Sequence, residues 1–127
     1  MSAFSNYLET KILQHVLTNT AYTSPTTVYL GLHTADPTDA GTGTEVSGGS
    51  YASQSVAFTV SGDTGSNTSA IEFPTATASW GTVGWVAVWD NLTGGNLLFH
   101  GALTSSKTIA SGDVFRIPAG DLDITLN

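Results

Sequence analysis

The N-terminal part of the chain carries a single amphipathic helical pattern. Its apolar side chains recur at intervals of three and four residues and form one stripe, made of Phe4, Tyr7, Leu8, Ile12, Leu13 and Val16. This spacing is typical of a helix that buries one of its faces. Ser2 or Ser5 provides the N-terminal cap, and Asn19 tolerates the left-handed conformation in which many helices end. We therefore expect a helix over residues 3–18, which either covers one end of the fold or docks on a neighbouring subunit.

From residue 26 onward, the pattern changes to the period of two that is typical of β-strands. Turn-forming Gly, Pro, Asn and Asp residues separate the apolar segments. We expect strands at residues 26–34, 51–60, 70–74, 84–89, 96–103, 108–109, 114–117 and 122–126, with an edge segment at 76–80. Residues 61–69 have the composition of a turn-rich connection. The polar segment 35–50 exceeds the usual loop length, which favours a functional or contact-making loop.

Seven to nine short strands separated by turns favour an antiparallel fold over a parallel α/β fold. We therefore predict an all-β fold, namely an antiparallel, jelly-roll-like β-sandwich of seven to nine strands with one N-terminal amphipathic helix. The sequence has no internal repeat and no change of composition that marks a domain boundary. We expect a single domain over residues 1–127, with the helix at 3–18 and the sandwich at 26–127.

The composition points towards assembly. Charged residues make up only 10% of the 127 residues, whereas soluble domains typically contain roughly 25%. The hydrophobic share is 40%, so neutral polar residues and 14 glycines take the remaining positions. Neutral faces cost less to desolvate than charged ones. This composition therefore favours a subunit that packs against neighbours.

The charge balance and the absence of cysteine exclude several classes of partner. Three Lys or Arg stand against ten Asp or Glu, giving a net charge of -7, so the basic cluster that nucleic acids or anionic membranes require is missing. Without cysteine, disulfides and thiolate metal sites are excluded. No apolar run approaches the ~18 residues of a membrane span, and a signal-peptide pattern is absent. We expect a soluble, unsecreted protein that binds neither nucleic acid nor membrane.

The sequence offers no constellation typical of an enzyme. Nucleophilic catalysis needs a base held against a nucleophile, and the candidate bases are His15, His33 and His100. No serine lies in a Gly-x-Ser-x-Gly elbow, and no feature supports a carboxylate pair for glycoside hydrolysis. We expect the histidines to be packed or half-exposed polar residues, and the protein to have no catalytic residue.

Acidic residues gather in two places that could hold calcium. Asp36, Asp39 and Glu45 share one loop, and Asp121 and Asp123 form a D-x-D pair. Neither group has the spacing of an EF-hand, and no histidine spacing suits zinc. We expect solvated acids and no cofactor or metal, with calcium binding as the alternative.

Three tryptophans lie close together in the sequence, at positions 80, 85 and 89. Their strand-like surroundings favour a place in the core. In the alternative, Trp80, beside Gly81, presents its ring to a protein partner or a sugar.

Four segments of the sequence carry a family resemblance: MSAFSNYLETKILQHVL, TVYLGLHTADPTDAGTGTEVSGGSYASQ, FPTATASWGTVGWVAVWDNLTGGNLLFHGAL and SGDVFRIPAGDLDITL. They resemble a family of small virion proteins of tailed bacteriophages, which are labelled either tail-fibre-like or structural. Only the stretch around residues 61–69 fits less well. The resemblance implies a virion protein without enzymatic activity, assembled in the cytoplasm of the host bacterium.

Within the virion, a small acidic β-sandwich suits a capsid decoration or cement protein, which binds the major capsid protein and stabilises the head. This comparison is an analogy at the level of the fold. One alternative is a tail, baseplate or tail-fibre component that binds tail structural proteins. A second alternative is a carbohydrate-binding module for host adsorption. In the structural roles we expect a homotrimer or another homo-oligomer.

The helix and the long loop are the segments expected to grip a capsid protein or a sister subunit. The predicted interface residues are Phe4, Tyr7, Leu8, Ile12, Asp36, Pro37, Glu45, Val46 and Trp80.

Overall fold

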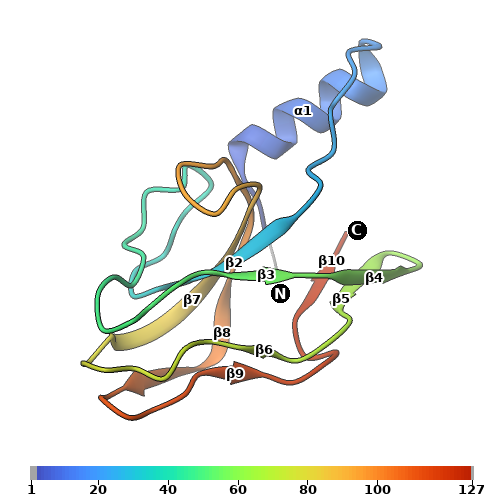
Figure 1. Ribbon diagram of the computed structural model, residues 1–127. Coiled ribbons are helices and arrows are strands. Elements are labelled where there is room, and N and C mark those ends of the chain that lie inside the picture. Colours follow the sequence, from blue (N-terminus) through green and yellow to red (C-terminus); the bar gives the residue numbers. More distant parts are fainter. Residues whose placement is uncertain (1–2, 127) are drawn as a thin grey trace.

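The computed structural model describes residues 3–126 (Figure 1). Within this range the chain forms one helix and ten strands. They are β1 (Ala3–Phe4), α1 (Asn6–Leu17), β2 (Val28–His33), β3 (Gln54–Val56), β4 (Phe58–Ser61), β5 (Thr64–Asn67), β6 (Ile71–Glu72), β7 (Gly81–Trp89), β8 (Leu97–Ile109), β9 (Arg116–Ile117) and β10 (Asp123–Thr125). No helix among the described residues is long and apolar enough to cross a membrane.

The main sheet has five antiparallel strands in the order β1-β8-β7-β2-β3. Its centre is the β7–β8 pair, which the sequence predicts as a hairpin around residues 90–95. The buried faces of β2 and β7 meet in register, with Leu30 opposite Val88 and Leu32 opposite Val86. Consecutive residues of both strands, 30–33 of β2 and 86–88 of β7, are buried, so this part of the main sheet is covered on both faces.

Two smaller antiparallel sheets complete the fold, in the orders β10-β5-β4 and β6-β9. In Figure 1, β6 and β9 lie side by side below the main sheet, and β4, β5 and β10 are grouped to its right. An aromatic cluster joins the β6–β9 sheet to the rest of the core. Phe73 stacks on Tyr51 at 6.0 Å between ring centroids and packs edge-to-face on Phe115 at 5.7 Å. The predicted all-β, sandwich-like fold is confirmed.

The structure divides the strand predicted over residues 51–60 between two sheets. β3 pairs with β2 in the main sheet, whereas β4 pairs with β5 in the second sheet. Ala57, between them, is where the chain passes from one sheet to the other. Conversely, the strands predicted at 96–103 and 108–109 are parts of one long strand, β8. Apolar periodicity indicates where strands are, but it does not indicate which sheet a strand joins.

The turn predicted over residues 61–69 is wrong, because residues 64–67 form strand β5. The segment has no large apolar side chain. Instead, its Asn67 is 2% exposed and holds the strand through buried hydrogen bonds. Its Nδ2 donates to the carbonyls of Ser69 at 2.9 Å and Pro118 at 3.0 Å, and its Oδ1 accepts from the Leu122 N–H at 2.9 Å. A buried, fully bonded amide thus holds a polar strand in place.

The helix begins later than the pattern predicts. Residues 3 and 4 form β1, which pairs with β8, and α1 runs over Asn6–Leu17. Ser5 lies between the two elements. It is the N-terminal cap of α1, because its side chain accepts a hydrogen bond from the Leu8 N–H. Ser2, the other predicted cap, lies outside the described residues.

Candidate assembly surface

The helix and the segment that follows it project from the β-sheets as an arm, which we define as residues 6–27. Figure 1 shows α1 leaving the body, a turn at its far end, and an extended segment that runs back to β2. No other described element extends so far from the sheets. The arm is therefore the first candidate for a contact surface.

The root of the arm is fixed by Ser5, which is 1% exposed. Its N–H donates to the carbonyl of Leu98 at 2.9 Å, and its hydroxyl donates to the carbonyl of Leu97. The ring of Phe4 packs edge-to-face on Phe99 at 5.1 Å. Backbone pairing, the cap and this aromatic contact together set the direction in which α1 leaves the sheet.

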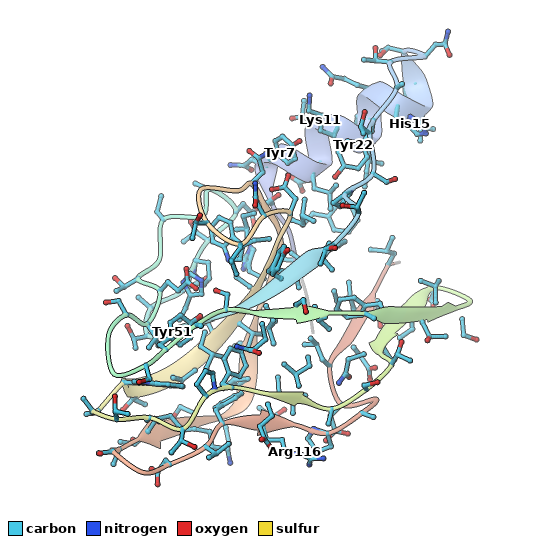
Figure 2. All side chains as sticks on the ribbon, in the orientation of Figure 1. Tyr7, Lys11, His15, Tyr22, Tyr51 and Arg116 are labelled. Atoms are coloured by element: carbon cyan, nitrogen blue, oxygen red, sulfur yellow. The ribbon has the colours of Figure 1, made fainter. Side chains whose placement is uncertain are left out.

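The inner face of α1 packs on the returning segment (Figure 2). The Tyr22 N–H donates to Nδ1 of His15 at 3.2 Å, and the Lys11 ammonium lies 5.6 Å from the centroid of the Tyr7 ring. Burial raises the pKa of Tyr22, and the neighbouring Tyr7 and an aspartate add to the shift. The Tyr22–His15 bond joins the return segment to the helix, whereas the Lys11–Tyr7 contact lies within α1.

The tip of the arm has a defined geometry. The hydroxyl of Thr18 donates to the carbonyl of Gln14 at 2.8 Å, and the Thr20 N–H donates to the same oxygen at 3.1 Å. Asn19 adopts a left-handed conformation with φ of 56°. The predicted end of the helix is confirmed. Asn suits this position because it tolerates the left-handed conformation better than most residues.

The outer face of α1 carries the longest exposed apolar stripe of the arm. Leu13, Val16 and Leu17 are 57%, 69% and 72% exposed, and their spacing of three and four residues places them on one helix face. Leu8, nearer the root, is buried, and Ile12 is partly buried against the core. The stripe therefore covers the body only near the root. Its outer half is free to contact another molecule.

The other predicted interface residues lie mostly in the body. Pro37 and Val46 are buried, and the Val46 N–H donates to the carbonyl of Leu32 at 2.9 Å. Asp36 is exposed, and it lies 3.8 Å from Nδ1 of His100. The long loop thus packs against the main sheet instead of projecting from it. The structure does not bring these residues together with the outer face of α1.

Trp80 belongs to the core. It is 4% exposed, its Nε1 donates to the carbonyl of Gly49 at 2.9 Å, and its ring lies edge-to-face on Tyr51 at 5.3 Å. The core interpretation is confirmed, and the alternative with an exposed Trp80 ring is wrong. Trp85 and Trp89 are both partly exposed, and Trp89 lines a pocket that the sequence pattern did not indicate. Its position at the start of a Gly-rich turn was the available signal.

The two acidic groups make contacts with other side chains. Asp39 lies 2.8 Å from Nε2 of His100, and Asp123 accepts a hydrogen bond from the Ser66 hydroxyl. Among residues 3–126, no group of three or more metal-binding side chains comes together.

A β-sandwich that exposes an apolar helical face has the features of a subunit that assembles with other proteins. The protein family described as "Podophage GP4 fiber I protein gp80" matches residues 3–125. Because the match extends over nearly the whole chain, the chain belongs to this family. No curated protein matches it.

The protein is therefore a structural protein of a bacteriophage virion, as its resemblance implied. The family description names a fibre protein, so it fits the tail-fibre alternative better than the predicted capsid decoration.

Proposed function

We propose that the protein is a subunit of a phage tail fibre and that the outer face of the arm attaches it to another fibre or tail protein. Membership of a fibre protein family supports the location. The exposed Leu13, Val16 and Leu17 support the mode of attachment, and they are the observation on which it rests.

The length of the helix also supports an external contact. α1 has 12 residues, and isolated helices shorter than about 12–15 residues are marginal in water. The chain's own return segment packs on one side only. A partner that covers the outer face would bury the remaining apolar side chains and stabilise the helix.

The surroundings of the histidines support a non-enzymatic role. His15 accepts from a backbone N–H, His33 stacks on Trp89 at 6.1 Å, and His100 lies beside two aspartates. None of these contacts presents a nucleophile for a histidine to activate. We propose that the protein acts by assembly, which takes place in the host cytoplasm.

The location is tested by electron cryo-microscopy of purified virions, with the subunit identified by fitting its fold into the map. We expect density for the β-sandwich in the fibres or at their attachment to the tail, at low copy number. Density repeated across the capsid lattice would overturn the proposal and restore the decoration role. Contacts between arms of identical subunits would show that the partner is a second copy.

A further inference from the structure

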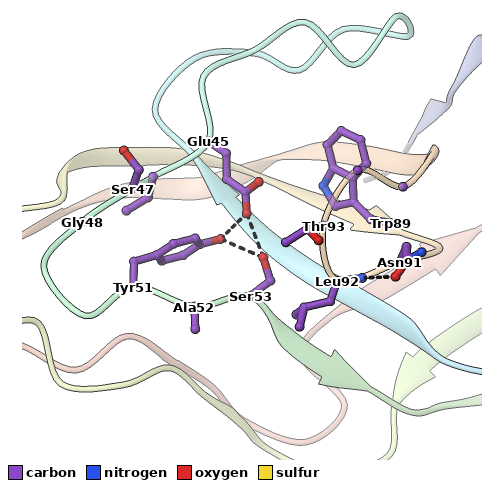
Figure 3. A pocket seen from close by; sticks show the side chains of 13 residues that line it. Glu45, Ser47, Gly48, Tyr51, Ala52, Ser53, Trp89, Asn91, Leu92 and Thr93 are labelled. Carbon is purple, nitrogen blue, oxygen red and sulfur yellow. Dashed lines mark hydrogen bonds between the residues drawn. The ribbon is translucent and has the colours of Figure 1, made fainter.

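A pocket of about 620 Å³, lined by none of the residues 6–27 of the arm, opens beside the main sheet (Figure 3). One wall is formed by residues 45–48 and 51–53, and the other by Trp89 and the turn at residues 91–95. The volume lies within the range of small-ligand pockets. Neither the family description nor the proposed attachment of the arm assigns a role to it.

The first wall holds a carboxylate in a fixed orientation. Oε2 of Glu45 accepts hydrogen bonds from the Tyr51 hydroxyl at 2.7 Å and the Ser53 hydroxyl at 2.8 Å. The Tyr51 oxygen itself accepts from the Leu32 N–H at 2.9 Å, and burial raises the pKa of this tyrosine. Oε1 of Glu45 has no hydrogen-bond partner in residues 3–126, so it remains available as an acceptor.

A glycine beneath the carboxylate makes this position possible. A Cβ on Gly31 would lie 2.8 Å from Oε2 of Glu45 and 3.4 Å from Nε1 of Trp89. A residue larger than glycine at position 31 would push the Glu45 carboxylate away from this position.

The second wall supplies an aromatic surface and hydrogen-bonding side chains. Trp89 is partly buried, and its Nε1 is enclosed without a hydrogen-bond partner in the described part of the chain. Figure 3 shows this nitrogen turned towards Glu45, with Thr93 between the two walls. Asn91 and Thr93 are exposed on the turn, which Asp90 holds by accepting the Asn96 N–H at 2.7 Å.

The lining selects a neutral ligand with many hydroxyl groups. No Lys or Arg lines the pocket, so an anion would meet only Glu45 and a net charge of -7. The walls offer acceptors and donors side by side, whereas a cation would use acceptors alone. A hydroxyl group both donates and accepts, and the C–H face of a sugar ring packs on an indole. We propose that this pocket binds a neutral saccharide, with Glu45 accepting from its hydroxyls and Trp89 packing on its ring.

The test is a titration of the full chain, labelled with ¹⁵N, followed by the amide resonances. The probes are glucose, galactose, mannose, rhamnose and N-acetylglucosamine, together with an array of bacterial surface polysaccharides. We expect at least one neutral sugar to shift the amides of residues 47–53 and 91–95 saturably and independently of salt. The double variant Asn91→Ala, Thr93→Ala, at exposed positions, should keep the fold and weaken binding. Leu13→Ser on the arm is the matched control and should bind as the parent does.

The Glu45→Gln variant distinguishes binding of a neutral sugar from binding of a cation. The amide keeps an acceptor, so it should weaken sugar binding by at most about tenfold. Failure of every sugar and every polysaccharide to shift these amides would overturn the proposal. It would also be overturned if arginine or lysine shifted them in a salt-dependent way and neutral sugars did not, with Glu45→Gln abolishing the effect. Either result leaves the attachment of the arm unaffected.

Discussion

The backbone N–H of Ser5 donates to the carbonyl of Leu98 at 2.9 Å, and this bond joins the start of the arm to the longest strand of the main sheet. The same residue caps α1 through its hydroxyl. One serine thus links the direction of the helix to the sheet. Because the bond to Leu98 uses the backbone, a substitution of the Ser5 side chain keeps this bond while it removes the cap and the hydroxyl's bond to the carbonyl of Leu97.

Ser5→Ala removes the cap and the hydroxyl's hydrogen bond to the carbonyl of Leu97, and it leaves the backbone bond to Leu98 in place. We expect the free energy of unfolding to fall by about 0.5–2 kcal/mol, with a loss of helical circular dichroism. Urea denaturation measures the free energy of unfolding, and the far-ultraviolet circular dichroism spectrum measures the helix content. Ser105→Ala, at an exposed position of β8, is the control and should change neither. An unchanged stability of Ser5→Ala would show that the root does not depend on the cap.

The outer face of the arm should be needed for assembly but not for folding. Leu13→Ser, Val16→Ser and Leu17→Ser each replace an exposed side chain, and such substitutions usually change stability by less than about 0.5 kcal/mol. Combined, they should prevent incorporation into virions, measured by immunoblotting of purified particles. Val114→Ser alters another exposed apolar residue, 46% accessible, and should be incorporated normally. Incorporation of the triple variant at parental levels would refute the role of the arm.

His33 should make the protein less stable in acid. It is 1% exposed, and burial lowers its pKa, partly opposed by the nearby Glu45 and reinforced by His100. The unfolded chain, with a histidine pKa near about 6.5, takes up the proton first as the pH falls. The stability that neutral, buried His33 gives the fold is therefore fully present above that pH. Below it, the free energy of unfolding falls by at most ~1.4 kcal/mol per pH unit. His33→Phe should reduce this slope in denaturation measured from pH 7 to 5, whereas exposed His15→Gln should retain it.

Asn67 should be the most sensitive polar residue of the body. Asn67→Ala removes three hydrogen bonds of a buried amide, those to the carbonyls of Ser69 and Pro118 and that from the Leu122 N–H, so we expect a loss of at least about 2 kcal/mol. Asn91→Ala, on an exposed turn, should cost little. One hydrophobic cluster contains residues of the main sheet and of the β6–β9 sheet, and partly buried residues of the β4–β5–β10 sheet pack against it. We therefore expect both variants to unfold in a single transition. Separate melting of the β4–β5–β10 sheet would contradict this expectation.

The helix, β2 and the β7–β8 pair were predictable because their apolar residues recur with a clear period. Val28, Leu30 and Leu32 alternate, and Trp89 and Leu97 flank a turn rich in Asn and Gly. β5 was not predictable, since its sequence is Thr-Gly-Ser-Asn. Besides its pairing with the neighbouring β4, it depends on hydrogen bonds to residues more than fifty positions away, and periodicity contains no information about such bonds.

The candidate surfaces were predictable only in part. The stripe on the helix was visible in the sequence, but its division between a covered root and an exposed tip depends on where the chain returns to the sheet. Glu45 was predicted as an interface residue, yet its partner wall, Trp89, lies more than forty residues further along the chain. The bridge between His33 and Glu45 and the antiparallel pairing of β2 with β7 together bring these two positions to one pocket.

The order β1-β8-β7-β2-β3 places the two attachment points of the arm on opposite sides of the β7–β8 pair. The arm leaves the sheet from β1 and re-enters it at β2, so it is a tether with two legs. A mechanical load applied at its tip, such as drag on a fibre, is divided between both legs. Both legs pass the load to the same central pair of strands, where it is spread over the longest hydrogen-bonded ladder of the protein. A subunit anchored in this way would resist detachment longer than one held by a single terminal strand.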